Sequence, residues 1–194
     1  LAACDSQQTS EEESSLDGLG TAGVEITTPF SSSSTTENGG TVSTKVRLKS
    51  APLSPVTITL NSSDTQEGTV SPTVLTFNKD NWDSYVSIIV TGVDDDIADG
   101  SQSYEIQIAS VVSEDSKYSA LNGQIDPIKL QNEDDEIKAI VLGSLSGDTT
   151  EAGGNATFSV KLASKPIEAV SIPIISTDTS EGSVSLSSLS LDNS

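Results

Sequence analysis

A long internal repeat constrains the fold of this chain more than any other feature. Residues 36–40 (TENGG) return as residues 150–154 (TEAGG), and residues 64–68 (DTQEG) return as residues 178–182 (DTSEG). From residue 36 to residue 80, 18 of 45 positions match the residue 114 places later, without a gap. So long a period is typical of tandem domains, because solenoid units are shorter. We therefore expect one whole module over residues 24–136 and the first part of a second, truncated copy over residues 137–194.

Short segments of alternating apolar and polar residues fill the first module. They lie at residues 24–27, 41–48, 56–60, 70–77, 86–90, 104–108 and 128–130, and they are rich in Val, Ile and Thr. Alternation with a period of two predicts strands, and no segment shows a convincing helical period. Seven strands in about 110 residues favour an all-β fold, an antiparallel β-sandwich of immunoglobulin-like type.

The acidic residues are distributed unevenly over the loops that join these strands. If successive strands alternate in direction, the loops at 29–40, 61–68 and 92–101 and the segment 131–136 share one end of the sandwich, called here the acid end. Eleven of the 15 loop acids lie there, with no Lys or Arg. They are Glu37, Asp64, Glu67, Asp94, Asp95, Asp96, Asp99, Glu133, Asp134, Asp135 and Glu136. The opposite end has only Asp80, Asp83, Glu114 and Asp115, accompanied by Lys79 and Lys117.

Carboxylates gathered in this way repel one another, and a hard cation relieves the repulsion. Calcium takes six to eight oxygen ligands in flexible geometry, so the sequence predicts a Ca²⁺ site at the acid end. The alternative interpretation is a set of ordinary polar loops, which explains the acidity but not its distribution.

The composition argues against several other functions. With 9 basic and 29 acidic residues the chain is not expected to bind nucleic acid, which needs Lys and Arg. It has no His, so the many Ser and Thr residues lack the usual general base, and we expect no enzyme activity. A pair of carboxylates as in glycosidases is not expected either, because nothing apolar surrounds the acids to raise a pKa. Trp82, in a loop at the opposite end, is expected to cap the core rather than to contact a ligand.

Three motifs resemble the Calx-β domain: residues 37–41 (ENGGT), 93–97 (VDDDI) and 132–136 (NEDDE). That domain is the calcium sensor of sodium–calcium exchangers and occurs in tandem in bacterial surface and secreted proteins. The resemblance covers residues 24–136 once and residues 137–194 in part. The chain departs from the family at one place. It lacks the family's Gly-rich stretch that ends in Asp-Tyr, and residues 64–68 (DTQEG) occupy that position instead.

The resemblance implies a set of calcium ligands. Carried over residue by residue, they are Glu37, Asp64, Asp94, Asp95, Asp96, the backbone carbonyl of Ile97, Asp99, Glu133, Asp134 and Asp135. Asp99 stands where the family usually has Glu. We expect binding at roughly 0.1 to 1 mM calcium, as in other extracellular modules.

The first residues resemble a bacterial lipobox. Residues 1–4 (LAAC) end in Cys4, the only cysteine, which is therefore expected to be lipidated. Residues 1–23 then form a lipobox remnant and an acidic, flexible tether with too little apolar surface to fold. We therefore expect the protein in the bacterial cell envelope, anchored by lipid at the outer membrane or cell surface.

These features together predict a structural or adhesive module that binds calcium at the junction with its neighbouring module. An extracellular protein or a glycan is a candidate ligand for such a surface protein. The alternatives are a calcium-independent immunoglobulin-like stalk, or a spacer for an adhesin or hydrolase domain elsewhere in a longer protein.

Overall fold

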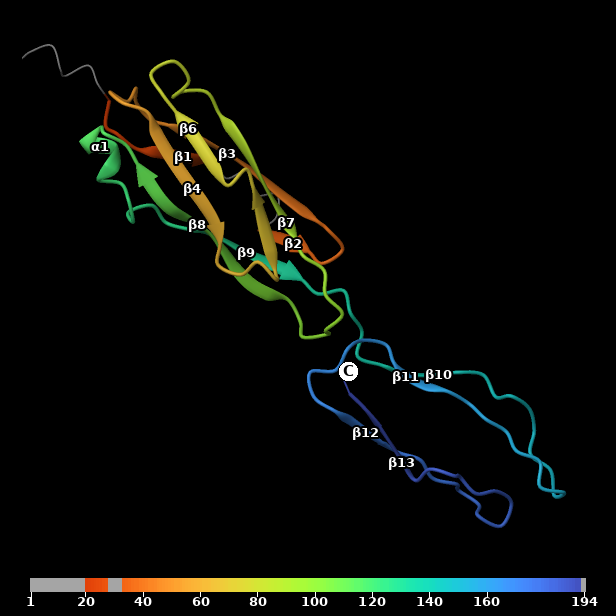
Figure 1. Cartoon of the computed structure of the whole chain (residues 1–194). Helices are drawn as coiled ribbons and strands as arrows, with labels where there is room; N and C mark the ends of the chain where they lie inside the picture. The colour runs from red at the N-terminus through yellow and green to blue at the C-terminus, as the bar shows by residue number, and fades with distance from the viewer. Residues whose placement is uncertain (1–19, 28–32, 193–194) are drawn as a thin grey trace, which may run out of the picture.

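The computed structural model describes residues 20–27 and 33–192, and its first module is a sandwich of two sheets (Figure 1). One sheet has the order β1-β3-β7-β5, formed by β1 (Val24–Thr27), β3 (Thr41–Leu48), β7 (Val86–Gly92) and β5 (Gly68–Ser71). The other has the order β2-β9-β8-β4-β6, formed by β2 (Ser34–Thr36), β9 (Ile128–Glu133), β8 (Gln102–Val112), β4 (Val56–Ser62) and β6 (Val74–Phe77). The expectation of an all-β sandwich is confirmed at this level.

The core lies between the two sheets and follows the alternation read from the sequence. Val42, Thr44, Val46 and Leu48 of β3 are buried, and the residues that alternate with them are exposed or half-buried. Strand β4 does the same with its alternating Val, Ile and Leu residues. Every second side chain of a strand faces the opposite sheet, so apolar residues spaced by two form one continuous core.

Two differences from the expected strands arise from polar or proline-containing sequence. Strand β2 was not expected, because its residues are Ser and Thr; it pairs in parallel with β9 and buries the side chain of Thr35. The single strand expected over residues 70–77 is instead divided into β5 and β6, which belong to different sheets. Pro72 lies at the division, and it has no backbone N–H to donate to a neighbouring strand.

The strand registers bring the expected loops to one end. Thr41 pairs with Thr91, Gly68 with Gly92, and Gln102 with Asn132. The loops at 37–40, 63–67 and 93–101 and the segment 134–136 therefore extend from the same end of the sandwich.

The opposite end is closed by a single helical turn and a tryptophan. Helix α1 (Ser116–Ser119) is capped by Asp115, whose carboxylate accepts from the backbone N–H of Lys117 at 3.0 Å and of Leu53 at 2.9 Å. Trp82 is partly buried and packs against the core, which is the capping role expected of it.

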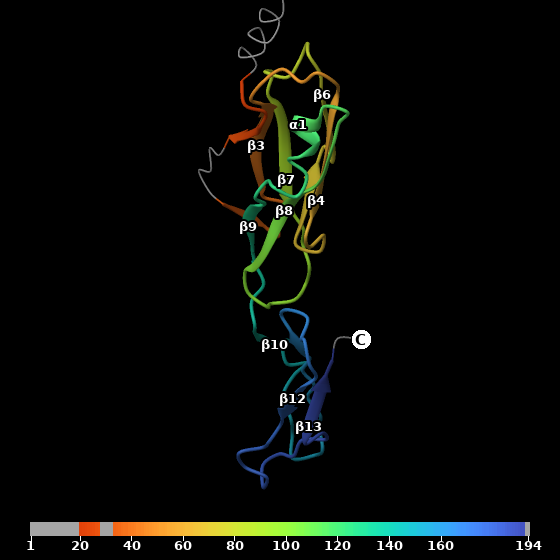
Figure 2. The same ribbon diagram turned by 90° about the vertical axis from the view of Figure 1, so that its left-hand side faces the viewer.

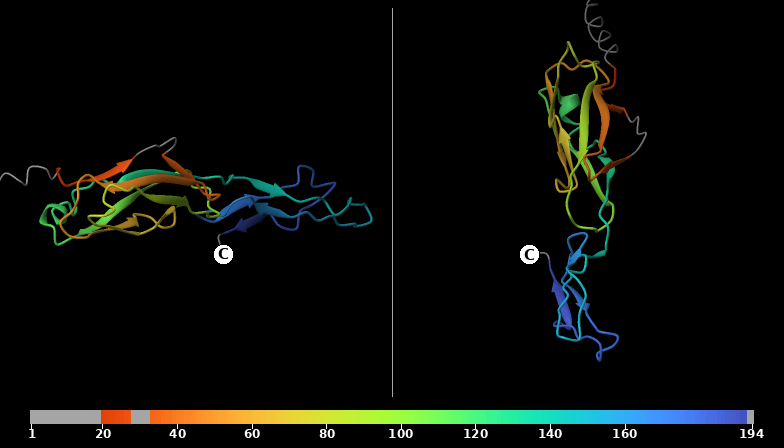
Figure 3. Two further views of the ribbon diagram at one scale, coloured as in Figure 1. Left: turned by 90° about the horizontal axis from the view of Figure 1, so that it is seen from above. Right: turned by 90° about the vertical axis from the view of Figure 1, so that its right-hand side faces the viewer.

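The second module consists of two separate strand pairs (Figure 3). They are β10 (Ile140–Leu142) with β11 (Val160–Leu162), and β12 (Val170–Pro173) with β13 (Ser188–Leu191). The pairing of Val170 with Leu191 is that of Val56 with Phe77 in the first module, displaced by 114 residues. The inward-facing side chains of these four strands are exposed or half-buried, whereas most of those of the first module are buried.

The second module continues from the acid end of the first (Figures 1 and 2). The backbone N–H of Lys165 donates to the carbonyl oxygen of Asp96 at 2.6 Å, and a parallel bridge joins Ile97 to Lys165. The acidic loop 93–101 is therefore in direct backbone contact with the second module.

Candidate metal centre

The turn that carries Glu37 is formed by its own sequence. The N–H groups of Gly39 and Gly40 both donate to the carbonyl oxygen of Thr36 at 3.1 Å, and the Thr36 hydroxyl accepts a second bond from Gly40. Gly39 has a φ of 86°, which favours glycine. The N–H of Glu37 donates to the carbonyl of Glu133 at 3.0 Å, so the turn is joined to the end of β9.

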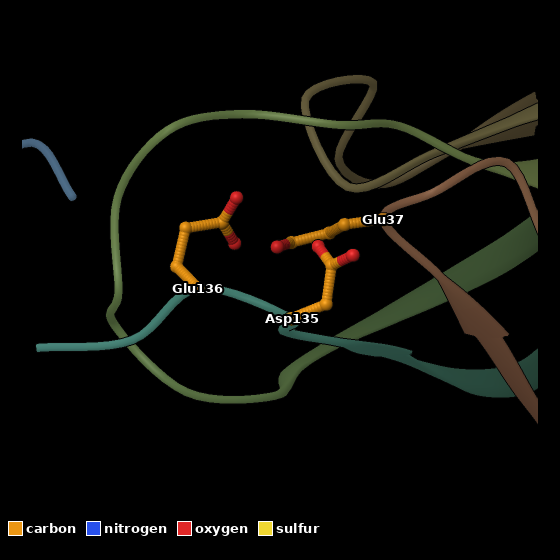
Figure 4. Close-up of side chains that lie close together, drawn as sticks. All are labelled: Glu37, Asp135 and Glu136. Atoms are coloured by element: carbon orange, nitrogen blue, oxygen red, sulfur yellow. The ribbon is translucent and has the colours of Figure 1, made fainter. Parts of the chain in front are cut away.

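Three carboxylates converge at this place (Figure 4). Oxygen atoms of Glu37, Asp135 and Glu136 lie within 4.8 Å of one another. Glu37 enters from the turn after β2, and the other two enter from the segment after β9. Glu37 is only 2% exposed, Asp135 is exposed, and Glu136 is half-buried.

Glu37 is a buried carboxylate with an unsatisfied oxygen. Its Oε2 atom, like Oε2 of Glu136, is buried and has no hydrogen-bond partner among the described residues. Burial, followed by the approach of Glu136 and the charges of Asp134 and Asp95, raises the pKa of Glu37 from 4.5 to about 8. The expectation that nothing around these acids raises a pKa is therefore wrong, because strand pairing buries a residue that stands in a polar turn.

The neighbouring carboxylates of Glu136 and Asp134 have pKa values shifted in opposite directions. Contact with Glu37 lowers the pKa of Glu136, but burial and the nearby Asp134 and Asp135 raise it by more, so the net change is upward. The pKa of Asp134 is lowered, because its carboxylate accepts from the backbone N–H groups of Glu136 and Gly100. Asp134 thus links segment 134–136 to loop 93–101 and stays ionised.

A second acidic group lies beside the first. Burial raises the pKa of Glu67, a weak bond from Asn132 at 3.5 Å lowers it, and the charges of Asp99, Asp64 and Asp95 raise it further. Asp95 contributes to the raised pKa of both Glu37 and Glu67, so the two groups share one negative field.

Asn132 joins the elements that carry these acids. It is fully buried; its amide donates to the carbonyl of Val93 at 2.9 Å, and its Oδ1 accepts from the Thr35 hydroxyl at 2.9 Å. The Thr35 hydroxyl also bonds the Tyr104 hydroxyl at 2.9 Å. One buried amide therefore connects β2, β9 and the start of loop 93–101.

The structure brings only part of the implied ligand set together. Glu37 and Asp135 belong to the three-carboxylate cluster, with Asp134 and Asp95 close enough to influence Glu37. Asp64, Asp94, Asp96, Asp99 and Glu133 lie outside that cluster and are exposed. The Glu133 carboxylate instead accepts from the Ser34 hydroxyl at 2.5 Å.

Three residues implied as ligands accept hydrogen bonds within their own loops. The Ile97 carbonyl accepts from the N–H of Asp99 at 2.8 Å, while the Asp95 carboxylate accepts from the N–H of Ile97 at 2.5 Å. Asp64 accepts from the N–H of Gln66 at 2.9 Å. These bonds hold the loops in shape and leave other oxygen lone pairs available.

Glu136 and Glu67 were counted among the acids of this end but not among its ligands. The alternation of β9 contains the missing signal, because Ile128, Leu130 and Asn132 face inward. Extending that period places Asp134 and Glu136 on the same side, and both are half-buried.

Comparisons with known proteins leave the family open. No family model matches the chain, and no curated protein matches it. Among solved structures, it is similar to WR4, a member of the C. elegans MSP family. The two are 10% identical with a TM-score of 0.33, over 58% of this chain and 96% of that one. No helix within residues 20–27 and 33–192 is long and apolar enough to cross a membrane. The lipidation expected at Cys4 and the tether up to residue 19 lie outside the described residues.

The chemistry open to this arrangement is the binding of a hard cation. All the side-chain ligand atoms are carboxylate oxygens from two separate segments. Two of these oxygens, Oε2 of Glu37 and Oε2 of Glu136, are buried and have no hydrogen-bond partner among the described residues. A cation between Glu37 and Glu136 would replace the proton that burial favours and would satisfy both Oε2 atoms.

Proposed function

We propose that the acid end of the first module binds calcium through Glu37, Asp135 and Glu136. The observation that supports this most directly is the buried, unpartnered Oε2 of Glu37 facing a second carboxylate. A buried carboxylate is costly unless it is paired or coordinates a metal. An all-oxygen donor set with exposed acids around it suits calcium better than zinc or copper, which favour His or Cys.

The role of the ion is to hold the junction between the two modules. The cluster joins the turn at Glu37 to segment 134–136, which leads into the second module. Loop 93–101 is bonded to the same segment through Asp134 and Gly100, and to the second module through Asp96 and Lys165. A cation at the cluster therefore stiffens the connection, and repulsion loosens it when the cation is removed.

The module family and the cellular location in this proposal are taken from the sequence resemblance. On this proposal the chain is part of a tandem array of Calx-β-like, immunoglobulin-like modules, anchored to a bacterial cell envelope through lipid on Cys4. Its function is structural or adhesive, not enzymatic. Mass analysis of the mature protein tests the anchor, and an unmodified Cys4 refutes it.

Calcium titration by calorimetry tests the binding site, with two matched variants. Glu37→Gln removes the buried charge, whereas Glu151→Gln makes the same change at the repeat counterpart, which is exposed. We expect heat of binding and a raised melting temperature for the native chain and for Glu151→Gln. Both signals should be lost in Glu37→Gln. No heat and no shift at millimolar calcium in the native chain would refute calcium binding.

One observation favours the calcium-independent stalk as the second candidate. Since the pKa of Glu37 is raised to about 8, Glu37 and Glu136 can share a proton near neutral pH and remain close without an ion. The same titration separates the candidates, because a proton-sharing pair needs no calcium to hold the junction.

A further inference from the structure

An asparagine followed by a glycine stands in the turn that carries Glu37. Asn38 is exposed, and Gly39 after it has a φ of 86°. The backbone nitrogen that follows an asparagine can attack the side-chain carboxamide, because the two groups can close a five-membered ring. A glycine at the attacking position lacks the Cβ that would hinder this approach. The turn therefore contains both reacting groups of a spontaneous deamidation.

The carboxamide of Asn38 is held by the hydroxyl of Thr36. That hydroxyl donates to Oδ1 of Asn38 at 2.9 Å and accepts from the backbone N–H of Gly40 at 3.1 Å. Negative charge develops on Oδ1 when a nucleophile adds to Cγ, and a donor already placed there stabilises that charge. The bond from Gly40 polarises the Thr36 hydroxyl and strengthens its donation. The turn therefore activates the carboxamide as well as holding it.

The attacking nitrogen is that of Gly39, and the turn can release it. Its N–H donates to the carbonyl oxygen of Thr36 at 3.1 Å, and the N–H of Gly40 donates to the same oxygen at 3.1 Å. Gly40 can therefore keep the turn closed while Gly39 gives up its bond. Among the described residues other than its two chain neighbours, no heavy atom lies within 4 Å of the position that a Cβ on Gly39 would occupy. The space that ring closure needs is therefore open.

A second asparagine–glycine pair in the sequence, Asn122 with Gly123, provides an internal comparison. Asn122 is also exposed, but its Oδ1 accepts from the backbone N–H of Val111 in β8 at 2.9 Å. Moving this carboxamide toward Gly123 would break its bond to the N–H of a buried residue, which is costly. The carboxamide of Asn38 instead bonds a hydroxyl of its own turn. Asn38 is therefore the more reactive of the two asparagines.

We propose that Asn38 is a site of spontaneous deamidation. The nitrogen of Gly39 forms a bond to Cγ of Asn38, and the bond from Cγ to Nδ2 breaks. The proton lost by the Gly39 nitrogen leaves with Nδ2 as ammonia, and a succinimide ring remains. Water then opens the ring at either of its two carbonyl groups. One product is an aspartate at position 38, and the other is an isoaspartate, in which the main chain runs through Cβ and Cγ.

The isoaspartyl product changes the turn that positions Glu37. It adds one methylene group to the main chain between residues 38 and 39, inside the turn closed by the bonds of Gly39 and Gly40 to Thr36. It also adds a negative charge one residue from Glu37, whose carboxylate already lies close to two others. On the proposed function, on which this consequence rests, calcium binding weakens as isoaspartate accumulates, because metal ligands must be held in place. The deamidation itself does not depend on calcium.

Peptide mass spectrometry on the full chain, incubated at neutral pH, tests the reaction at both asparagine–glycine pairs. We expect the peptide that contains Asn38 to show the mass change of an NH₂ group replaced by OH, and a protein isoaspartate methyltransferase to label it. The peptide that contains Asn122 should convert several-fold more slowly. No conversion at Asn38, or conversion no faster than at Asn122, overturns the proposal.

The second copy of the turn supplies a matched variant, Asn38→Ala. Ala152 stands at the counterpart of Asn38, and that turn keeps its shape, with Gly153 donating to the carbonyl of Thr150 at 2.9 Å and Gly154 to its hydroxyl at 3.0 Å. The variant should therefore fold in the same way and cannot deamidate at this position.

Calorimetry on fresh and incubated protein tests the consequence for calcium. The heat of binding should fall in proportion to isoaspartate in the native chain and stay unchanged in Asn38→Ala. A converted chain that binds like fresh protein overturns the link to the metal centre. If fresh protein binds no calcium, the proposed function fails, and melting in chelator tests the turn instead. The converted chain should then melt at a lower temperature than Asn38→Ala incubated in the same way, and equal melting overturns the change to the turn.

Discussion

At the scale of single residues, the two copies of one turn show how burial changes chemistry. Glu37 and Glu151 stand at the same place in turns of the same shape, with Gly39 at φ 86° and Gly153 at φ 90°. Gly153 donates to the carbonyl of Thr150 at 2.9 Å, as Gly39 does to that of Thr36. Glu37 is buried against segment 134–136, whereas Glu151 is exposed. The turn sequence therefore determines local shape but not whether its glutamate is buried.

The raised pKa of Glu37 predicts a pH-dependent stability in the absence of metal. The folded state binds a proton up to about pH 8, whereas the unfolded chain loses it near pH 4.5. Its stabilising contribution is thus complete below pH 4.5 and is lost as the pH rises to 8. Thermal melts in chelator should show a falling melting temperature over this window, and Glu37→Gln should flatten the fall. A fall of equal size in Glu37→Gln would show that another group is responsible.

Proton release should accompany calcium binding for the same reason. Glu37 is largely protonated at pH 7, so a cation that takes its place displaces a proton. Calorimetry at pH 7 in buffers of different ionisation enthalpy should report about one proton released per calcium ion. At pH 9 the release should approach zero. A proton count of zero at both pH values contradicts the proposed role of Glu37.

The buried amide of Asn132 is predicted to stabilise the acid end. Asn132→Ala removes the amide that donates to the Val93 carbonyl and the oxygen that accepts from the Thr35 hydroxyl, so it should lower the free energy of unfolding by about 1–3 kcal/mol. Gln131→Ala, at the exposed neighbouring position of β9, is the matched control and should change little. Urea denaturation measures both, and equal effects would argue against the network.

At the scale of strands, identical residues differ in how much apolar surface they bury. Leu48 of β3 is 0% exposed between two sheets, while Leu162 of β11 is only half-buried. Leu48→Ala should therefore destabilise the first module by about 2–5 kcal/mol, as expected for a core leucine. Leu162→Ala should cost much less in the chain as it stands. Urea unfolding followed through Trp82, which lies in the first module, distinguishes the two variants.

At the scale of the whole molecule, charge opposes the close approach of the modules. The chain has a net charge of −20, and eleven of its acids gather where the modules meet. Calcium should therefore restrict the motion of the second module relative to the first. ¹⁵N relaxation should give more similar rotational correlation times for residues 33–136 and 137–192 when calcium is added. The Glu151→Gln variant should respond in the same way, and Glu37→Gln should not.

Much of the fold follows from the sequence, because it depends on local patterns. Alternation with a period of two placed the strands from β3 to β9 correctly, apart from the division at Pro72. Strand β2 could not be predicted from its own residues, because Thr35 becomes a core residue only through bonds to Tyr104 and Asn132. A polar strand has no hydrophobic signature until its partners are known.

The sequence by itself determined the repeat, the turn at Glu37 and the gathering of acids at one end. Each depends on residue order or on hydrogen bonds within about five residues. Only the tertiary structure decided which carboxylates meet, because Glu37 and Glu136 stand almost 100 positions apart in the chain. It also decided that the glutamate of one copy of the repeated turn is buried and that of the other is exposed. Burial depends on strands from distant parts of the chain, and the described part of the second module has too few of them to close a core.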